Sequence, residues 1–290
     1  MKKTLFATFV AILSLCLSIN AQDTNALLWQ VSGKNLSQPS YLFGTIHLMC
    51  PDDIQITQPM EDALKNSQQL VLELDMDEPG MMMNMQKVAM MTDGTTLNDL
   101  LTEEEHQMVG DYLQDSLKIP IQALNTMKPL MLSTLTFLDV LNCQPGSYEM
   151  QLVQHVKEQG KEVLGLETIE DQAQAFDFIP LEEQADYLVE AIQKYDETVS
   201  ETEALLAAYQ NKQVEHLYDL THASMQEMDG AEEALLTNRN NKWISKMEEM
   251  AQSQATFFAV GAAHLGGPMG VIALLKEQGY TVEAVSSVGQ

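Results

Sequence analysis

The sequence is poor in basic residues and in cysteine. Lysine and arginine total 15 against 42 aspartates and glutamates, a formal net charge of −27 over 290 residues. A negative field of that size repels phosphate groups, which argues against a nucleic-acid partner and against binding to anionic membranes. Three cysteines exclude a disulfide-rich scaffold and a zinc ribbon built on cysteine. Apolar residues still make up 45%, too many for a disordered chain.

Long hydrophobic runs are also absent, apart from one at the N-terminus. Two lysines precede an uncharged apolar run at residues 5–19, and the small Ala21 offers a cleavage point. This pattern predicts a secretory signal peptide over residues 1–21, with the mature chain exported to the periplasm or the extracellular space. The run is short for a membrane span, although an uncleaved anchor is the alternative. We therefore expect residues 22–290 to be exported, without stable membrane insertion.

Export bears on how the cysteines are interpreted. Removing the signal peptide leaves Cys50 and Cys143, and an isolated pair in an oxidising compartment usually forms a disulfide. Closing a loop of about 90 residues is worth roughly 4 kcal/mol in the chain-entropy model. Two free buried thiols are the alternative. A catalytic cysteine is disfavoured, because neither cysteine has a histidine beside it in a recognisable motif.

Strand patterns lie at both ends of the chain, and helical patterns lie between them. Apolar runs predict strands at 27–31, 41–46, 70–75, 162–166, 256–260 and 280–285. Helices are expected at 57–67, 102–117, 147–160 and 268–278, and the polar stretch 181–251 also has helical periodicity. The first two strands are separated by turn residues and predict a hairpin. Together these elements predict an α/β fold in one domain, with a largely helical middle region that is inserted into the sheet or covers it.

Two of the expected strands are followed by the motif Gly-x-x-His, which ends at His47 and at His264. A third strand ends with Glu73 and Asp75, which strand alternation would place on one face. Sites in α/β sheets form at the carboxyl ends of strands, where glycine lets the chain turn and lets a ligand approach the backbone. We therefore expect both histidines and at least one of the carboxylates to converge on one crevice.

Two imidazoles and a carboxylate allow two chemistries. They can hold a divalent metal ion that activates water. Alternatively, one histidine acts as a general base oriented by Glu73, and the other polarises the substrate. The spacing does not choose between them, and a purely structural role, in which both histidines cap strands, is the third alternative.

Arg239 is the only arginine in the chain, which otherwise uses lysine for fixed positive charge. A lone arginine indicates a planar fork that grips a carboxylate or stabilises an oxyanion, since lysine cannot do this. An ordinary surface position is the alternative. Glu149 and Glu167 are secondary candidates for the same crevice, because Glu167 ends a strand as Glu73 does. Glu149 begins a helix, where a carboxylate also suits the helix dipole.

Seven methionines lie between residues 76 and 91. Thioethers can bind Cu(I) in exported proteins. More often methionine forms a pliable apolar surface, and a lid beside the strand that ends at Glu73 is the interpretation we favour. Such a lid would suit a peptide or another apolar substrate.

The motifs of this chain resemble those of the TraB/GumN family. The resemblance covers nearly all of residues 22–290 and rests on the following segments: 42–47, 72–75, 165–168, 239–240, 260–266 and 274–280. It implies a single domain of this type, with a central mixed β-sheet flanked by helices. It also implies kinship with the Tiki metalloproteases and, more remotely, with erythromycin-esterase-like and ChaN-like haem-binding proteins.

The matching positions imply roles for four residues. His47, Glu73, Arg239 and His264 match catalytic positions, and His47, Glu73 and His264 match metal-binding positions. The expected function is an exported metal-dependent hydrolase, a peptidase in particular, that uses Mn²⁺, Co²⁺ or Zn²⁺ on a peptide or small-molecule substrate. Two alternatives are a non-catalytic protein that sequesters a peptide or signal, and a metal- or haem-binding module without turnover.

Overall fold

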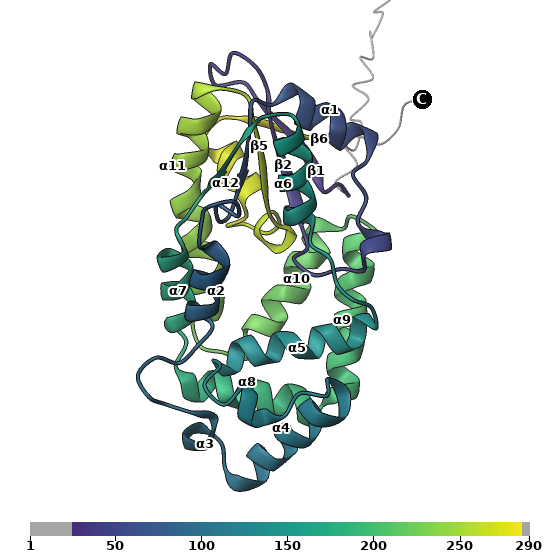
Figure 1. Ribbon diagram of the computed structural model, residues 1–290. Coiled ribbons are helices and arrows are strands. Elements are labelled where there is room, and N and C mark those ends of the chain that lie inside the picture. The colour runs from purple at the N-terminus through teal and green to yellow at the C-terminus, as the bar shows by residue number, and fades with distance from the viewer. Residues whose placement is uncertain (1–24, 286–290) are drawn as a thin grey trace, which may run out of the picture.

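The computed structural model describes residues 25–285, so the signal peptide expected at residues 1–21 lies outside the described residues. A six-stranded mixed sheet has the order β4-β3-β5-β2-β1-β6 (Figure 1). Its strands are β1 Leu28–Ser32, β2 Ser40–Thr45, β3 Gln69–Leu72, β4 Glu162–Gly165, β5 Thr256–Gly261 and β6 Thr281–Ala284. The expected α/β fold with a central mixed sheet is confirmed.

The direction of the strands brings several carboxyl ends to one edge of the sheet. Strands β4, β3, β5 and β2 pair in parallel. Strand β1 pairs antiparallel with β2, as the expected hairpin, and also with β6. Because β2, β3, β4 and β5 end at the same edge, the residues that follow them are neighbours in space.

Strand β3 ends three residues earlier than the sequence predicts. Strand β3 stops at Leu72, and its pairing with β5 ends one residue earlier, at Val71. The chain bends at Glu73, so strand alternation no longer applies to the residues that follow. Glu73 is buried, whereas Asp75 is only half-buried. The expectation that these two carboxylates share a strand face is therefore wrong.

Helices cover both faces of the sheet. Helix α6 packs against β3 and β4, and helix α11 packs against β5 and α12. In Figure 1 the sheet lies between α11 and α12 on one side and α1 and α6 on the other. Buried apolar residues of these strands and helices form one large core. The helices of this layer are α1 Gln58–Asn66, α6 Tyr148–Glu158, α11 Asn238–Ser253 and α12 Val271–Glu277.

The helical middle region lies beyond the carboxyl edge of the sheet (Figure 1). Helices α3, α4, α5 and α8 pack around a hydrophobic cluster of their own, which includes Leu97, Val109 and Leu132. The capping box expected at Thr102 and Glu105 begins α4. The helices of this region are α2 Met81–Val88, α3 Leu97–Leu100, α4 Glu103–Ser116, α5 Pro129–Leu141, α7 Ile169–Asp177, α8 Leu181–Gln193, α9 Tyr195–Gln210 and α10 Val214–Met225. The region is thus inserted next to the sheet rather than laid over its faces.

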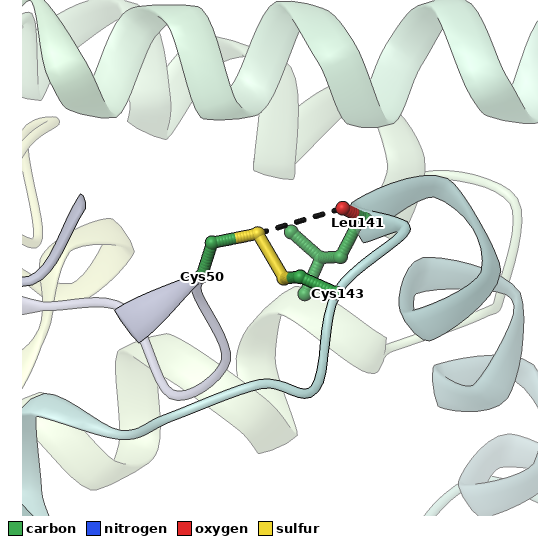
Figure 2. The surroundings of a disulfide bond; sticks show 3 residues. All are labelled: Cys50, Leu141 and Cys143. Carbon is green, nitrogen blue, oxygen red and sulfur yellow. Dashed lines mark hydrogen bonds between the residues drawn. A yellow bond between two sulfur atoms is a disulfide. The ribbon is translucent and has the colours of Figure 1, made fainter. Parts of the chain in front are cut away.

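The expected disulfide between Cys50 and Cys143 is present, with the two Cα atoms 5.9 Å apart. It joins the segment that follows β2 to the segment that precedes α6 (Figure 2). The carbonyl oxygen of Leu141 lies 3.5 Å from Cys50 Sγ. Among residues 25–285, no helix is both long enough and apolar enough to cross a membrane.

Candidate functional site

The residues singled out from the sequence gather where the parallel strands end. His47 follows β2, Glu73 follows β3, Glu167 follows β4 and His264 follows β5. Arg239 reaches them from the first turn of α11. All of these except His47 are buried. The convergence expected from the two Gly-x-x-His motifs is therefore present in the structure.

Arg239 is the centre of the buried charges. Its Nη2 donates to Glu73 Oε2 at 2.5 Å and to Glu167 Oε1 at 2.7 Å, and its Nε donates to both oxygens of Glu167 at 3.2 Å. Its Nη1 donates to the carbonyl oxygen of Leu235 at 2.9 Å. The side chain also lies over the ring of Trp243, 4.8 Å from the ring centroid. The fork expected from the lone arginine thus holds two carboxylates of the chain itself.

Glu73 is ionised and has one oxygen turned toward the two histidines. Its Oε2 is taken by Arg239, and its Oε1 accepts a hydrogen bond from the backbone nitrogen of Gly261 at 2.7 Å. Burial acts to raise the pKa of Glu73, but the Arg239 guanidinium and the nearby imidazoles hold it well below its usual range. Glu73 Oε1 lies 3.9 Å from His264 Nε2.

His264 is held in one neutral form. Its Nδ1 lies 2.6 Å from Asn240 Oδ1, an oxygen that can only accept, so Nδ1 carries the proton. The amide nitrogen of Asn240 donates to the Met269 carbonyl oxygen at 2.8 Å, which fixes the direction of the amide. His264 Nε2 is therefore unprotonated and accepts from Arg239 Nη1 at 3.1 Å. Burial and the Arg239 charge lower the pKa of His264 to about 3, against the attraction of Glu73.

His47 is held in the protonated, charged form, unlike the neutral His264. Its Nδ1 donates to Glu149 Oε1 at 2.8 Å. Glu149 also accepts from Thr45 Oγ1 and from Ser147 Oγ, both at 2.6 Å, so its carboxylate is fixed. Desolvation acts to lower the pKa of His47, but the Glu149 hydrogen bond and charge, with the charge of Glu73, raise it to about 9. The His47 side chain is 64% exposed, so water screens part of that attraction.

The two glycines of the motifs serve different purposes. A Cβ on Gly44 would lie 2.8 Å from Leu265 Cδ1, so this glycine allows the chain around His264 to pack on β2. A Cβ on Gly261 would lie 3.3 Å from Glu73 Oε1, 3.5 Å from His264 Cδ2 and 3.7 Å from His47 Nε2. Gly261 thus leaves open the space that the two histidines and Glu73 surround.

The atoms around this space are of the types that bind divalent metal ions. Each imidazole has Nδ1 hydrogen-bonded to a side-chain oxygen, as metal-binding histidines usually do, and this arrangement directs Nε2 toward a metal. Imidazole nitrogen with a carboxylate oxygen is a common ligand set for Zn²⁺. A metal ion would have to displace Arg239 Nη1 from His264 Nε2, and it would also have to displace the proton that the raised pKa keeps on His47 Nε2. Within the described part of the chain, no three His, Cys, Asp or Glu side chains are already closed around a metal position.

Sequence reasoning ranked Glu149 and Glu167 second, and the structure places both in the site. Two roles were not predicted from the sequence. Asn240 orients His264, and Trp243 donates from Nε1 to Glu167 Oε2 at 3.0 Å. A signal was available, because Arg239, Asn240 and Trp243 are spaced to lie on one side of a helix. All three are buried.

The methionine-rich segment lies next to the site. It forms α2, where Met81 is buried, while Met82 and Met83 are 73% and 59% exposed. Met81 lines a cavity of about 280 Å³ together with Asp75 and Glu167. Helix α2 therefore forms a wall beside one carboxylate of the site, and its role as a lid stays a prediction.

Comparison with known proteins places the chain beside one family and several curated relatives. The model of the TraB/PrgY/gumN family matches residues 27–284. "Metalloprotease TIKI2" of Danio rerio is 23% identical over 91% of this chain and 62% of its own length. "Metalloprotease TIKI2" of Xenopus tropicalis is 22% identical over 90% and 60%, and "Metalloprotease TIKI1" of Danio rerio is 21% identical over 90% and 63%.

The chain spans about three-fifths of the length of these relatives. No solved structure matched it. The family model covers almost all of the described residues and both Gly-x-x-His motifs. The resemblance drawn from the motifs is confirmed, and the chain belongs to the TraB/PrgY/gumN family.

Proposed function

We propose that this chain is an exported metal-dependent hydrolase that cleaves peptides. The observation that carries the proposal is the space beside Gly261, which is bounded by His47 Nε2, Glu73 Oε1 and the ring of His264. Two imidazoles and one carboxylate that converge on one point are the parts of a hydrolytic metal site. The metalloprotease names of the relatives support the same reaction class.

Export is supported by the disulfide, since such bonds persist in oxidising compartments. The apolar N-terminal run supports it as well. A peptide substrate is supported by the position of the site at the carboxyl edge of the sheet, where the exposed His47 and the methionine-rich helix α2 lie. Pliable methionine surfaces suit extended apolar ligands.

The proposed ligands are His47, Glu73 and His264, with Mn²⁺, Co²⁺ or Zn²⁺ as the ion. Such an ion polarises a carbonyl group and lowers the pKa of a bound water when it is present. Glu149 accepts from His47 Nδ1, so Nε2 faces the site, and a metal ion would bind there by displacing the proton that the raised pKa keeps on Nε2. Asn240 likewise accepts from His264 Nδ1.

Arg239 keeps Glu73 ionised, so Glu73 Oε1 can bind a cation, whereas the lowered pKa makes it a weak base toward water. Burial of Glu73, Glu167 and Arg239 leaves one excess negative charge among these three groups, which favours a cation in the space.

A second candidate is a non-catalytic protein that binds a peptide in the same crevice. The observation in its favour is the hydrogen bond from Arg239 Nη1 to His264 Nε2, because this bond occupies one proposed ligand atom. In that case the buried charges would hold the strand ends in place and a peptide would bind without being cleaved.

The test begins with elemental analysis of the purified mature protein. A peptide library is then assayed for cleavage by mass spectrometry after chelation and after re-addition of Mn²⁺, Co²⁺ or Zn²⁺. We expect about one metal ion per chain and metal-dependent cleavage, with His47→Ala and Glu73→Gln each reducing cleavage by at least about 10²-fold.

The matched control is His216→Ala, which removes an exposed histidine of α10 and should keep both properties. Peptide binding without metal or cleavage would establish the second candidate. Metal binding without cleavage of any peptide would leave a metal-binding module without turnover.

A further inference from the structure

The disulfide lies close in sequence to two partners in the site. Cys50 follows His47 by three residues, and Cys143 precedes Glu149 by six. The disulfide therefore joins the same two segments as the hydrogen bond from His47 Nδ1 to Glu149 Oε1. These segments belong to the end of β2 and to the start of α6.

A pair of backbone hydrogen bonds lies between the Cys50–Cys143 disulfide and the His47–Glu149 ion pair. Met49 donates to the Gly146 carbonyl oxygen at 3.2 Å, and Gly146 donates to the Met49 carbonyl oxygen at 2.8 Å. This pair is isolated from the sheet, so no strand ladder supports it. From Cys50 back to Thr45, the first segment is therefore tied to the second by the disulfide, by these backbone hydrogen bonds, and by Glu149, which accepts from His47 and Thr45.

We propose that the Cys50–Cys143 disulfide positions His47 against Glu149, so that the site is assembled only in the oxidised chain. Cys50 and Cys143 are positioning residues in this account, since neither reaches the space beside Gly261. The coupling between the disulfide and the His47–Glu149 pair holds whether or not the protein is an enzyme. Its consequence, that a reduced chain has an incomplete hydrolytic site, rests on the proposed function.

The physical basis is the entropy of ordering the two connecting segments. The core holds β2 and the start of α6 together in either redox state, since the rings of Phe43 and Tyr148 pack with their centroids 5.4 Å apart. Without the disulfide, the segments that follow β2 and precede α6 are joined by the Met49–Gly146 bridge and the His47–Glu149 pair. Exposed ion pairs contribute only about 0–1 kcal/mol, which is small beside the roughly 1–2 kcal/mol that ordering the backbone of each residue costs. The disulfide orders these residues in advance, and the pair in turn holds the two sulfur atoms together. The two ties therefore stabilise each other to the same extent.

The redox step is an ordinary exchange with a dithiol. One thiolate of the dithiol attacks a sulfur of the disulfide, and its second thiol then displaces the other cysteine. Two cysteine thiols form, the dithiol becomes a cyclic disulfide, and two electrons and two protons pass to the protein. Both cysteines are half-buried, so the bond is open to a small reductant.

The experiment measures how readily the disulfide is reduced. The folded protein is equilibrated with mixtures of reduced and oxidised dithiothreitol, and free thiols are counted by alkylation and mass spectrometry. We expect Glu149→Gln to favour reduction by up to about fivefold in the equilibrium constant, which corresponds to about 20 mV. Glu158→Gln, an exposed change on the same helix, should leave the equilibrium unchanged.

A general loss of stability must be separated from local coupling. Val109→Ala lies in the core of the helical region, away from both segments, and destabilises the fold. For each variant, the shift in the redox equilibrium is divided by the loss of melting temperature. The coupling is established if this ratio is larger for Glu149→Gln than for Val109→Ala. It is overturned if the two shifts are proportional to the loss of melting temperature, or if Glu149→Gln produces no shift.

Hydrogen exchange gives a second, independent readout. Reduction should speed the exchange of the Met49 and Gly146 amides, while amides in β5, such as that of Phe258, keep their protection. Unchanged exchange at Met49 and Gly146 in the reduced, folded protein would overturn the proposal. If the reduced protein loses protection in β5 as well, the comparison of Glu149→Gln with Val109→Ala decides the question.

Discussion

His47 Nδ1 lies 2.8 Å from Glu149 Oε1, although 102 residues separate them in the chain. Glu149 stands in the first turn of α6, where acidic residues are common because they suit the helix dipole. Here the carboxylate does more, since Thr45 and Ser147 also donate to it and fix its position. The direction of the His47 ring therefore depends on a helix that no recognised motif marks.

Replacing Glu149 by glutamine should change the titration of His47. The hydrogen bond and the charge of Glu149 raise the pKa of His47 to about 9, so their loss should return it toward 6.5. NMR titration of the imidazole signals of the metal-free protein measures this directly. Glu158→Gln should leave the pKa of His47 as it is, and a His47 pKa that does not move in Glu149→Gln would show that the pair has no energetic weight.

Arg239→Lys should destabilise the fold rather than act as a conservative change. Lysine cannot donate to Glu73, Glu167 and His264 at once, so at least one of these buried groups loses its partner. Loss of one partner of a buried ion pair costs about 3 kcal/mol or more in unfolding free energy, which urea denaturation can measure.

Lys242→Arg is the matched control for Arg239→Lys, because Lys242 is exposed on the same helix. It should change the unfolding free energy by less than about 0.5 kcal/mol. An Arg239→Lys protein as stable as the parent would mean that the buried network contributes nothing to the fold.

The sequence predicted the strands and the convergence of the motifs for a clear physical reason. Apolar runs bounded by turn residues mark strands, and glycine followed by histidine at two strand ends points to one edge of a sheet. The position of Glu149 could not be predicted in the same way, because it depends on how α6 packs against the sheet. The order of the strands likewise depends on pairing between segments far apart in the chain.

The end of β3 shows where pattern reasoning fails. The alternation of residues 70–75 predicts one long strand, but pairing with β5 ends at Val71. Glu73 then bends toward Arg239 and the backbone of Gly261, contacts that no local pattern encodes. The partners of Asn240 and Trp243 were missed for the same reason, since both act on groups that come from other elements.

The metal-free protein should be most stable just above pH 6.5. The pKa of Glu73 is held below its usual range and that of His264 is lowered from 6.5 to about 3. The folded state therefore binds fewer protons than the unfolded state on the acid side, and stability falls as pH drops from 6.5 toward 3. His47 has the opposite sign, because its folded pKa is raised to about 9. Its contribution is complete below pH 6.5 and is lost as pH rises to 9.

Urea midpoints measured across this pH range in the presence of a chelator test the prediction. The alkaline decline should stay below about 1 kcal/mol, since the His47 side chain is largely exposed. His264→Gln should flatten the acid decline, and His47→Gln should remove the alkaline one. A parent protein whose stability is constant between pH 6.5 and 4 would contradict the assigned protonation states.

Counting thiols tests the disulfide and the processing of the chain together. Cys50 and Cys143 are paired, so the unfolded but unreduced protein should show no free thiol once residues 1–21 have been removed. A chain that keeps those residues also contains Cys16 and should show one. Intact mass gives the site of cleavage. Two or more free thiols per chain in exported material would contradict the pairing.

Gly261→Ala should weaken metal binding and lower activity while sparing the fold. Gly261 has a φ of −51°, which alanine adopts without strain. The added methyl group would occupy the space between Glu73, His264 and His47, at 3.3 Å, 3.5 Å and 3.7 Å from their nearest atoms. Metal affinity should fall by more than about tenfold, or about 1.4 kcal/mol, in titration calorimetry. The melting temperature should change little.

Gly44→Ala is the matched control, because it adds the same methyl group to the other motif. There the Cβ would lie 2.8 Å from Leu265 Cδ1 and 3.1 Å from the backbone of Ala262, so overpacking should cost about 1–3 kcal/mol of stability. The space beside Gly261 stays open in this variant, and the folded fraction should keep its metal affinity. If Gly261→Ala binds metal as the parent protein does, the ion does not lie in that space. The histidines and Glu73 would then serve the fold or bind a different ligand.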